Sequence, residues 1–166
     1  MNQVDSNRVG EQASPLGGWG AAEPMAIAVC CLVIILALVL GVGLPSGLVL
    51  RHLVQTIPLW AGVALGFRRS NTTGWIGLPL FLFWLLLMAL IWAYLLGIPT
   101  FFSGHFSPVE VAMTIVVGAA SVIGIVMFAR LKSGLRAARA ASLFFVVCVV
   151  QWLCFRVSFW SAFVHR

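Results

Sequence analysis

Six polar residues in otherwise apolar stretches of this sequence have side chains that could bind a ligand. They are Arg51, His52, Gln55, Glu110, Gln151 and Arg156. The first three share one helical face, because spacings of three and four residues bring side chains together on a helix. Ionisable groups in apolar segments are functional candidates by default. We expect Arg51 and His52 to extend to lipid headgroups, as long basic side chains near helix ends do; the alternative is that all six residues form an outward-facing polar pocket.

Glu110 and Arg156 carry the opposite charges that could pair within this cluster. Glu110 is the single acidic residue beyond the N-terminal tail, and Arg156 lies inside an apolar stretch. A charged side chain at such a position costs at least a few kcal/mol unless it is paired or reaches the membrane interface. We therefore predict an ion pair between Glu110 and Arg156.

Catalytic and metal chemistry have little support in the sequence. There are only four acidic residues, and three of them lie in the N-terminal tail, which excludes most paired-carboxylate mechanisms. No G-x-S-x-G or nucleotide-binding glycine loop is present. The four cysteines lie in apolar stretches without a C-x-x-C pair, as expected for small packing residues. We expect no metal and no cofactor.

Five long apolar stretches must position the polar cluster. They are residues 25–44, 47–67, 75–96, 109–129 and 140–164. About 20 apolar residues match the roughly 30 Å hydrocarbon core of a bilayer. The charged fraction is 8%, against about 25% in a soluble domain. The predicted fold class is therefore all-α, a polytopic transmembrane helical bundle with about five spans.

The second stretch leaves an alternative open. It contains Arg51, His52 and Gln55, and from Leu53 to Phe67 it would be only about 22 Å long as a helix. Four spans plus a re-entrant segment would then replace five spans. A full span is favoured, because Gly62 and Gly66 form a GxxxG pair that permits close helix packing in lipid. Ala120 and Gly124 form a similar small-residue face.

One helix start is signalled clearly. Ser107, Pro108 and Glu110 fit an N-cap, a first helical position and the third residue of a capping box. The segment before it, residues 97–107, contains His105 and is expected to lie on the membrane surface.

Basic residues between the stretches predict the orientation. Arg68 and Arg69 lie in one loop, and the basic loop of residues 130–139 is expected to be helical. The four basic residues of that loop are Arg130, Lys132, Arg136 and Arg139. Loops rich in Lys and Arg are retained in the cytoplasm, so the N-terminus is predicted inside and the polar cluster outside. The alternative role of the basic loop is recruitment of anionic lipid or an acidic partner.

The predicted domain organisation follows from these signals. Residues 1–24 are polar and are expected to form a disordered cytoplasmic tail, and residues 25–166 form one transmembrane domain. We expect the protein to lie in the inner or plasma membrane. The basic residues lie between apolar stretches and not on a soluble domain, so nucleic acid is not an expected partner.

Three functional hypotheses remain. The first is a non-catalytic membrane subunit or assembly partner, which would contact the lipid bilayer and another membrane protein, or itself, through small-residue helix faces. The second is a small oligomeric transporter or channel that uses the polar cluster. The least favoured is a lipid-acting enzyme with His52 or His105 as the base.

Overall fold

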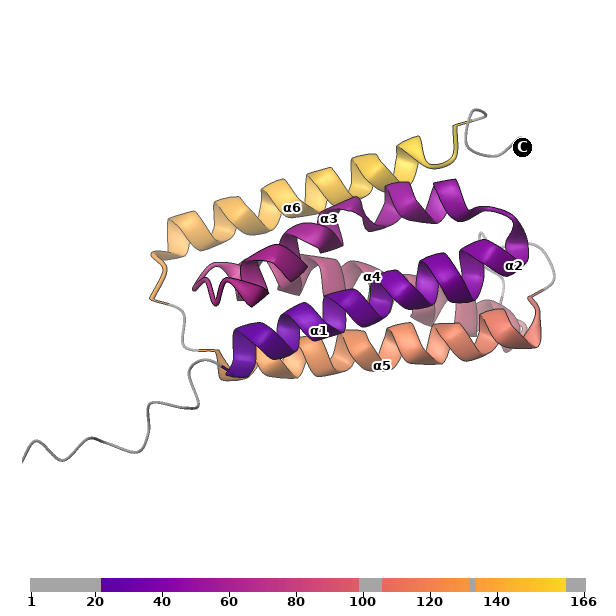
Figure 1. Cartoon of the computed structure of the whole chain (residues 1–166), viewed down its shortest axis with the longest axis horizontal. Coiled ribbons are helices and arrows are strands. Elements are labelled where there is room, and N and C mark those ends of the chain that lie inside the picture. The colour runs from indigo at the N-terminus through magenta and orange to yellow at the C-terminus, as the bar shows by residue number, and fades with distance from the viewer. Residues whose placement is uncertain (1–21, 99–105, 132–133, 161–166) are drawn as a thin grey trace, which may run out of the picture.

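The computed structural model describes residues 22–98, 106–131 and 134–160. Over these residues the chain is a bundle of antiparallel helices, without strands (Figure 1). This confirms the all-α class. Four helical segments of the described chain are long and apolar enough to cross a membrane, as expected for a multi-pass membrane protein.

The first helical segment runs from Ala22 to Ser46 with two changes of helix type. It begins as α1 (Ala22–Leu36), continues as the π-helix η2 (Ala37–Gly43) and ends as the short α2 (Leu44–Ser46). Four long helices follow: α3 (Val49–Phe67), α4 (Thr73–Leu95), α5 (Pro108–Arg130) and α6 (Ala137–Val157).

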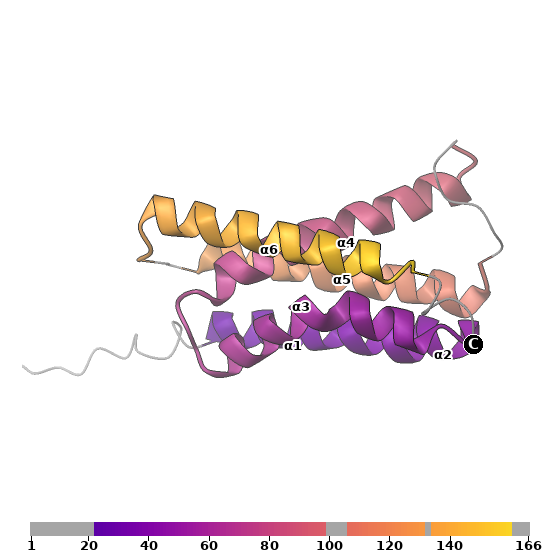
Figure 2. The same ribbon diagram turned by 90° about the horizontal axis from the view of Figure 1, so that it is seen from above.

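Besides the four most apolar segments, the described chain has one more long helix, α3, which covers the stretch that was ambiguous in the sequence. It is continuous over 19 residues, about 28 Å at 1.5 Å per residue. It lies along α1 and runs in the opposite direction (Figures 1 and 2). It does not belong to the four most apolar segments, since Arg51, His52 and Gln55 reduce its hydropathy.

The core of the bundle is formed by α1, η2, α3, α4 and α5. Ile34, Leu59, Leu80, Phe81 and Val117 are all fully buried in it. Helix α6 lies outside this core and packs against α4 and α3 (Figure 2). Ala140 and Gln151 are the two residues within α6 that are buried, so most of the helix presents apolar side chains to its surroundings.

Small residues allow α1 and α3 to pack closely. A Cβ at Gly66 would lie 2.5 Å from the carbonyl oxygen of Pro24 and 2.6 Å from the Cβ of Ala28. A Cβ at Gly62 would lie 2.8 Å from the Cys31 sulfur. The predicted GxxxG pair therefore lies in a helix contact that larger side chains would separate.

Left-handed residues end three of the helical segments. Gly47 (φ 70°) and Gly97 (φ 83°) follow α2 and α4, and Arg69 (φ 53°) follows α3. After α3, the amide of Ser70 donates to the Leu65 carbonyl at 3.0 Å, the pattern of a Schellman motif. Glycine adopts this conformation without steric cost, which explains why the Gly47 turn can join α2 to α3 so tightly.

The loop between α5 and α6 differs from the prediction. Helix α5 ends at Arg130 and α6 begins at Ala137. Leu131 and residues 134–136 are not helical, so the predicted helix across the basic loop is wrong over the residues described. The extended backbone of Leu131 (ψ 117°) and Arg136 (ψ 138°) stops one helix and starts the next.

The described arginines outside helix interiors collect at one end of the bundle, which we call the basic end. Arg68 and Arg69 lie in the α3–α4 turn, and Arg130, Arg136 and Arg139 flank the α5–α6 connection. All five are exposed. The antiparallel arrangement brings these two connections together (Figure 1).

Replacing Gly66 with alanine should weaken the contact between α1 and α3. The new methyl group would meet the Pro24 carbonyl and Ala28, and overpacking of this kind costs about 1 to 3 kcal/mol. Equilibrium unfolding in mixed micelles, followed by tryptophan fluorescence, measures this change.

Gly118→Ala is the matched control. A Cβ at Gly118 would have nothing within 4 Å, so this variant should be unchanged or more stable by up to about 1 kcal/mol. Equal effects of the two substitutions would contradict the proposed close contact at Gly66.

Candidate functional site

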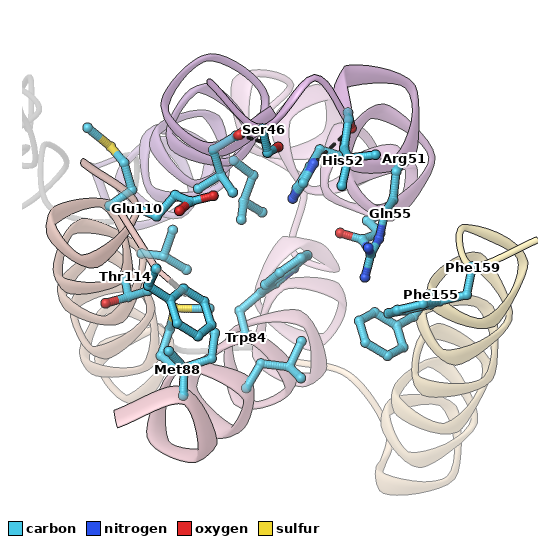
Figure 3. A pocket seen from close by; sticks show the side chains of 18 residues that line it. Ser46, Arg51, His52, Gln55, Trp84, Met88, Glu110, Thr114, Phe155 and Phe159 are labelled. Atoms are coloured by element: carbon cyan, nitrogen blue, oxygen red, sulfur yellow. Dashed lines mark hydrogen bonds between the residues drawn. The ribbon is translucent and has the colours of Figure 1, made fainter. Parts of the chain in front are cut away.

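A pocket of about 270 Å³ is lined by residues from the first turns of α3 and α5, at the end of the bundle opposite the basic end. Figure 3 shows its lining side chains. This volume is near the lower limit of small-molecule sites, which span roughly 300–1,000 Å³. We call the two ends the pocket end and the basic end. Six of the lining residues are polar or charged: Ser46, Arg51, His52, Gln55, Glu110 and Thr114. The others are apolar or aromatic, as is typical of ligand sites.

The first turns of α3 provide one wall. Arg51, His52 and Gln55 all line the pocket, as their spacing predicted. The guanidinium carbon of Arg51 lies 3.8 Å from the centre of the Phe159 ring, a cation–π contact. Its Nε atom is buried and has no hydrogen-bond partner. Arg51 is thus held in position by an aromatic ring and not by an anion.

The tautomer of His52 is determined by a backbone carbonyl. Nδ1 of His52 lies 2.9 Å from the Leu48 oxygen, and a carbonyl can only accept, so Nδ1 donates. In the neutral ring this leaves Nε2 as a hydrogen-bond acceptor. The imidazole is 9% exposed and lines the pocket.

Glu110 approaches from the opposite wall, on the first turn of α5. Its backbone amide donates to the Ser107 hydroxyl at 3.2 Å, and its Oε2 accepts from the Ser107 amide at 2.7 Å. The predicted capping box is therefore present. The same carboxylate lines the pocket and faces α3 across it (Figure 3). The cap holds the charge at a defined position, since it uses the backbone as well as the side chain.

Helix α4 contributes Trp84 and Met88 to the pocket. Trp84 is 2% exposed, and its indole Nε1 has no hydrogen-bond partner. A buried indole N–H usually has a partner. Its ring extends toward the space between Glu110 and Arg51 (Figure 3), so the pocket holds a second unpaired donor beside Arg51.

The π-helix η2 shapes the pocket from the side of α1. Leu38 and Val42 of this segment line the cavity. Gly43, its last residue, allows α3 to pass closely, because a Cβ there would lie 3.2 Å from the Val49 Cα and 3.4 Å from the His52 ring. π-helical turns occur frequently at functional sites.

A buried hydrogen-bond network joins α3 to α6 behind the pocket. Gln55 donates through Nε2 to the Ser158 hydroxyl at 2.9 Å, and Ser158 donates to the Phe155 carbonyl at 2.6 Å. Gln151 donates through Nε2 to the Gln55 carbonyl at 3.2 Å. The three side chains are at most 4% exposed. Because α6 has few buried apolar residues, this network is an important specific attachment of α6 to α3.

The structure brings together most of the predicted polar cluster. Four of its six residues line the pocket, and Gln151 contacts Gln55 directly. Arg156 is exposed and does not line it. Within the described chain, the predicted Glu110–Arg156 ion pair is not formed. The prediction assumed that consecutive helices are neighbours, whereas α6 packs on α3 and α4 and α5 packs on α1 and α4.

The other predicted residues lie either away from the pocket or outside the residues that the structure describes. Arg130, Arg136 and Arg139 are exposed at the basic end, while Lys132 and His105 lie outside the described residues. In the described part of the chain, no group of three His, Cys, Asp or Glu residues could hold a metal ion.

Sequence reasoning missed three important residues. Trp84 and Phe159 resemble ordinary apolar residues in long apolar stretches, and Ser158 follows the last residue of α6. Their roles depend on contacts with Arg51 or Gln55, which lie far away in the sequence. The spacing of Gln151 and Ser158, about two turns apart on one helix face, was the one available signal.

Comparison of this chain with protein-family models, with curated proteins and with solved structures finds no significant match.

Replacing Ser158 with alanine should loosen α6. The buried amide of Gln55 would lose its acceptor, which costs about 1 to 2 kcal/mol for such a bond within a membrane protein. The loss is expected in equilibrium unfolding in mixed micelles.

Ser142→Ala provides the same chemical change on the same helix. The Ser142 hydroxyl is exposed and donates to the Ala138 carbonyl of its own helix, so its removal should change stability by less than about 0.5 kcal/mol. If Ser158→Ala is as mild as this control, the network does not attach α6.

Proposed function

We propose that this chain is a small multi-pass membrane protein that binds a small ligand in an outward-facing pocket, as the substrate site of a transporter does. The observation that supports this most is the convergence of Arg51, His52, Gln55 and Glu110 on one cavity with apolar walls. Ionisable residues within apolar segments are costly and are retained mainly for function.

The unpaired donors in the pocket support a binding role. Arg51 Nε and Trp84 Nε1 are buried without a partner, and each unpaired buried donor costs about 1 to 3 kcal/mol. A residue used only for packing would not need such groups. A ligand with hydrogen-bond acceptors would satisfy both donors once the side chains that cover these two atoms move aside.

The distribution of charged residues supports a pocket that opens to the outside of the membrane. The exposed arginines of the basic end favour a cytoplasmic position for that end by the positive-inside rule. The pocket is at the other end, so it opens away from the cytoplasm. With five crossing helices, α3 included, the N-terminus is on the inside.

A through channel within one copy has less support than a binding site. Beyond the pocket, toward the basic end, the interior of the described bundle contains Leu59, Leu80 and Phe81, all fully buried. This packed core separates the pocket from the basic end. Transport would therefore require a rearrangement of the helices and not simple passage.

Cysteine labelling tests the orientation and the access to the pocket. Ser46→Cys and Thr114→Cys place thiols on its lining. A membrane-impermeant maleimide added from the outside should label both in intact cells or right-side-out vesicles, because water enters an outward-open pocket.

Ala119→Cys is the control, since Ala119 is exposed on the same helix α5 but does not line the pocket. The unmodified chain provides the background from Cys30, Cys31, Cys148 and Cys154, which lie within α1 and α6. Labelling at Ala119→Cys but not at Thr114→Cys, or labelling only after the cells are opened, would refute the proposal.

A membrane subunit is the second candidate, and the exposed face of α6 favours it. Phe145 and Trp152 of α6 are 67% and 55% exposed, and Trp160, which follows the end of the helix, is 68% exposed. Aromatic side chains on an exposed face are common where membrane proteins contact a partner. Lipid would cover the same face in a protein that acts alone.

Purification of a tagged chain from its native membrane in a mild detergent distinguishes the two candidates. A stoichiometric partner that is lost in a Trp152→Ala, Phe145→Ala variant would support the subunit. A chain that purifies alone, or only with copies of itself, would favour the ligand-binding protein. Arg156→Gln is a suitable control, because Arg156 is exposed on the same helix.

A further inference from the structure

The pocket contains one positive and one negative side chain that do not neutralise each other. Arg51 belongs to α3 and Glu110 to α5, and both line the cavity. They approach it from opposite sides (Figure 3). Among the described residues, neither takes part in an ion pair. Two opposite charges that share a cavity without pairing leave room for a ligand between them.

Arg51 lacks an anionic partner. Its contact within the described chain is the face of Phe159, and its buried Nε has no acceptor. A guanidinium always carries its charge and presents a planar set of donors that fits carboxylate and phosphate groups. The nearby indole N–H of Trp84 is also unpaired. This side of the pocket is suited to an anionic group.

Glu110 makes the opposite wall unsuited to a simple anion. One carboxylate oxygen, Oε2, accepts from the Ser107 amide, and no described residue donates to the other. A carboxylate that faces a small cavity repels a negatively charged ligand and attracts an ammonium group. Because the capping box fixes Glu110 on α5, it cannot easily turn away from the ligand.

Most of the remaining pocket lining is apolar. Met88, Leu87, Val117 and Phe155 belong to it. These residues would contact a hydrocarbon portion of the ligand, and the bound ligand would displace water from the pocket, which strengthens both charge contacts.

From this arrangement we infer that the ligand is a zwitterion with an apolar portion, its anionic group bound by Arg51 and Trp84 and its ammonium group bound by Glu110. This inference rests on the proposed function, since it names the ligand class of the same pocket. An α-amino acid with an apolar side chain has this chemistry, and so does the headgroup region of an ethanolamine phospholipid.

Matched probes test the two charges separately. The purified chain in a neutral maltoside detergent is mixed with L-leucine, with 4-methylpentanoate, which lacks the ammonium group, or with 3-methylbutylamine, which lacks the carboxylate. A ligand that binds the folded state raises the unfolding temperature in proportion to its affinity. We expect leucine to bind at least about tenfold more tightly than either analogue, since each analogue loses one of the two charge contacts.

A lipid arm distinguishes the two sources of this chemistry. Lysophosphatidylethanolamine carries a phosphate and an ammonium group, whereas lysophosphatidylglycerol of the same chain length carries the phosphate alone. Preference for the ethanolamine lipid without binding of leucine identifies a phospholipid headgroup. Binding of leucine identifies a free amino acid.

Two substitutions assign the charges to their walls. Glu110→Gln keeps the capping box, because glutamine serves at the same position, and removes the negative charge. This variant should bind the anionic and zwitterionic probes equally. Arg51→Gln should abolish binding of both. If the glutamine variant does not fold, Arg51→Lys replaces it; this variant keeps the charge but lacks the planar set of donors, so it should weaken binding of both probes. Arg156→Gln is exposed and outside the pocket, so it should bind as the unmodified chain does.

Equal binding of zwitterionic and singly charged probes to the unmodified chain would overturn the inference. So would failure of every zwitterionic probe to bind at millimolar concentration. Either result leaves the proposed function standing if cysteines in the pocket are labelled from outside. If those cysteines are not labelled, the proposed function itself fails.

Discussion

The hydrogen-bond network of Gln55, Gln151 and Ser158 is the interaction on which the arrangement of this protein depends most. In a hydrocarbon environment, apolar surfaces gain little by meeting each other, and helices associate through close packing and polar contacts. Helix α6 has few buried apolar residues, so the amides of Gln55 and Gln151 fix its position and register on α3. That register brings Phe155 and Phe159 to the pocket.

The pocket is a consequence of this attachment and of the close contact between α1 and α3. Gly62 and Gly66 hold the two helices together toward the basic end, while the π-helix η2 and the Gly47 turn change the path of the chain at the pocket end. Arg51 and Glu110 then face each other across a gap and not across a packed interface.

Much of the fold could be predicted from local signals. Apolar stretches of suitable length predicted the long helices, and Ser107, Pro108 and Glu110 predicted the start of α5 with its capping box. The face formed by Arg51, His52 and Gln55 was also predicted, because it depends only on helical periodicity. The partner of Arg51 was not predicted, because the sequence does not state which helices are neighbours. The partner of Arg51 is the ring of Phe159. Arg156 lies outside the pocket.

The sequence by itself determined the class of protein, the approximate helices, the polar face of α3 and the distribution of basic residues, because all of these follow from composition, length and periodicity along one segment. The tertiary structure decided which side chains share a cavity, which helices lie next to α6 and where Glu110 points. These depend on packing between segments that are far apart in the sequence, and small residues such as Gly66 and polar residues such as Gln151 select one packing arrangement from several that the apolar pattern allows.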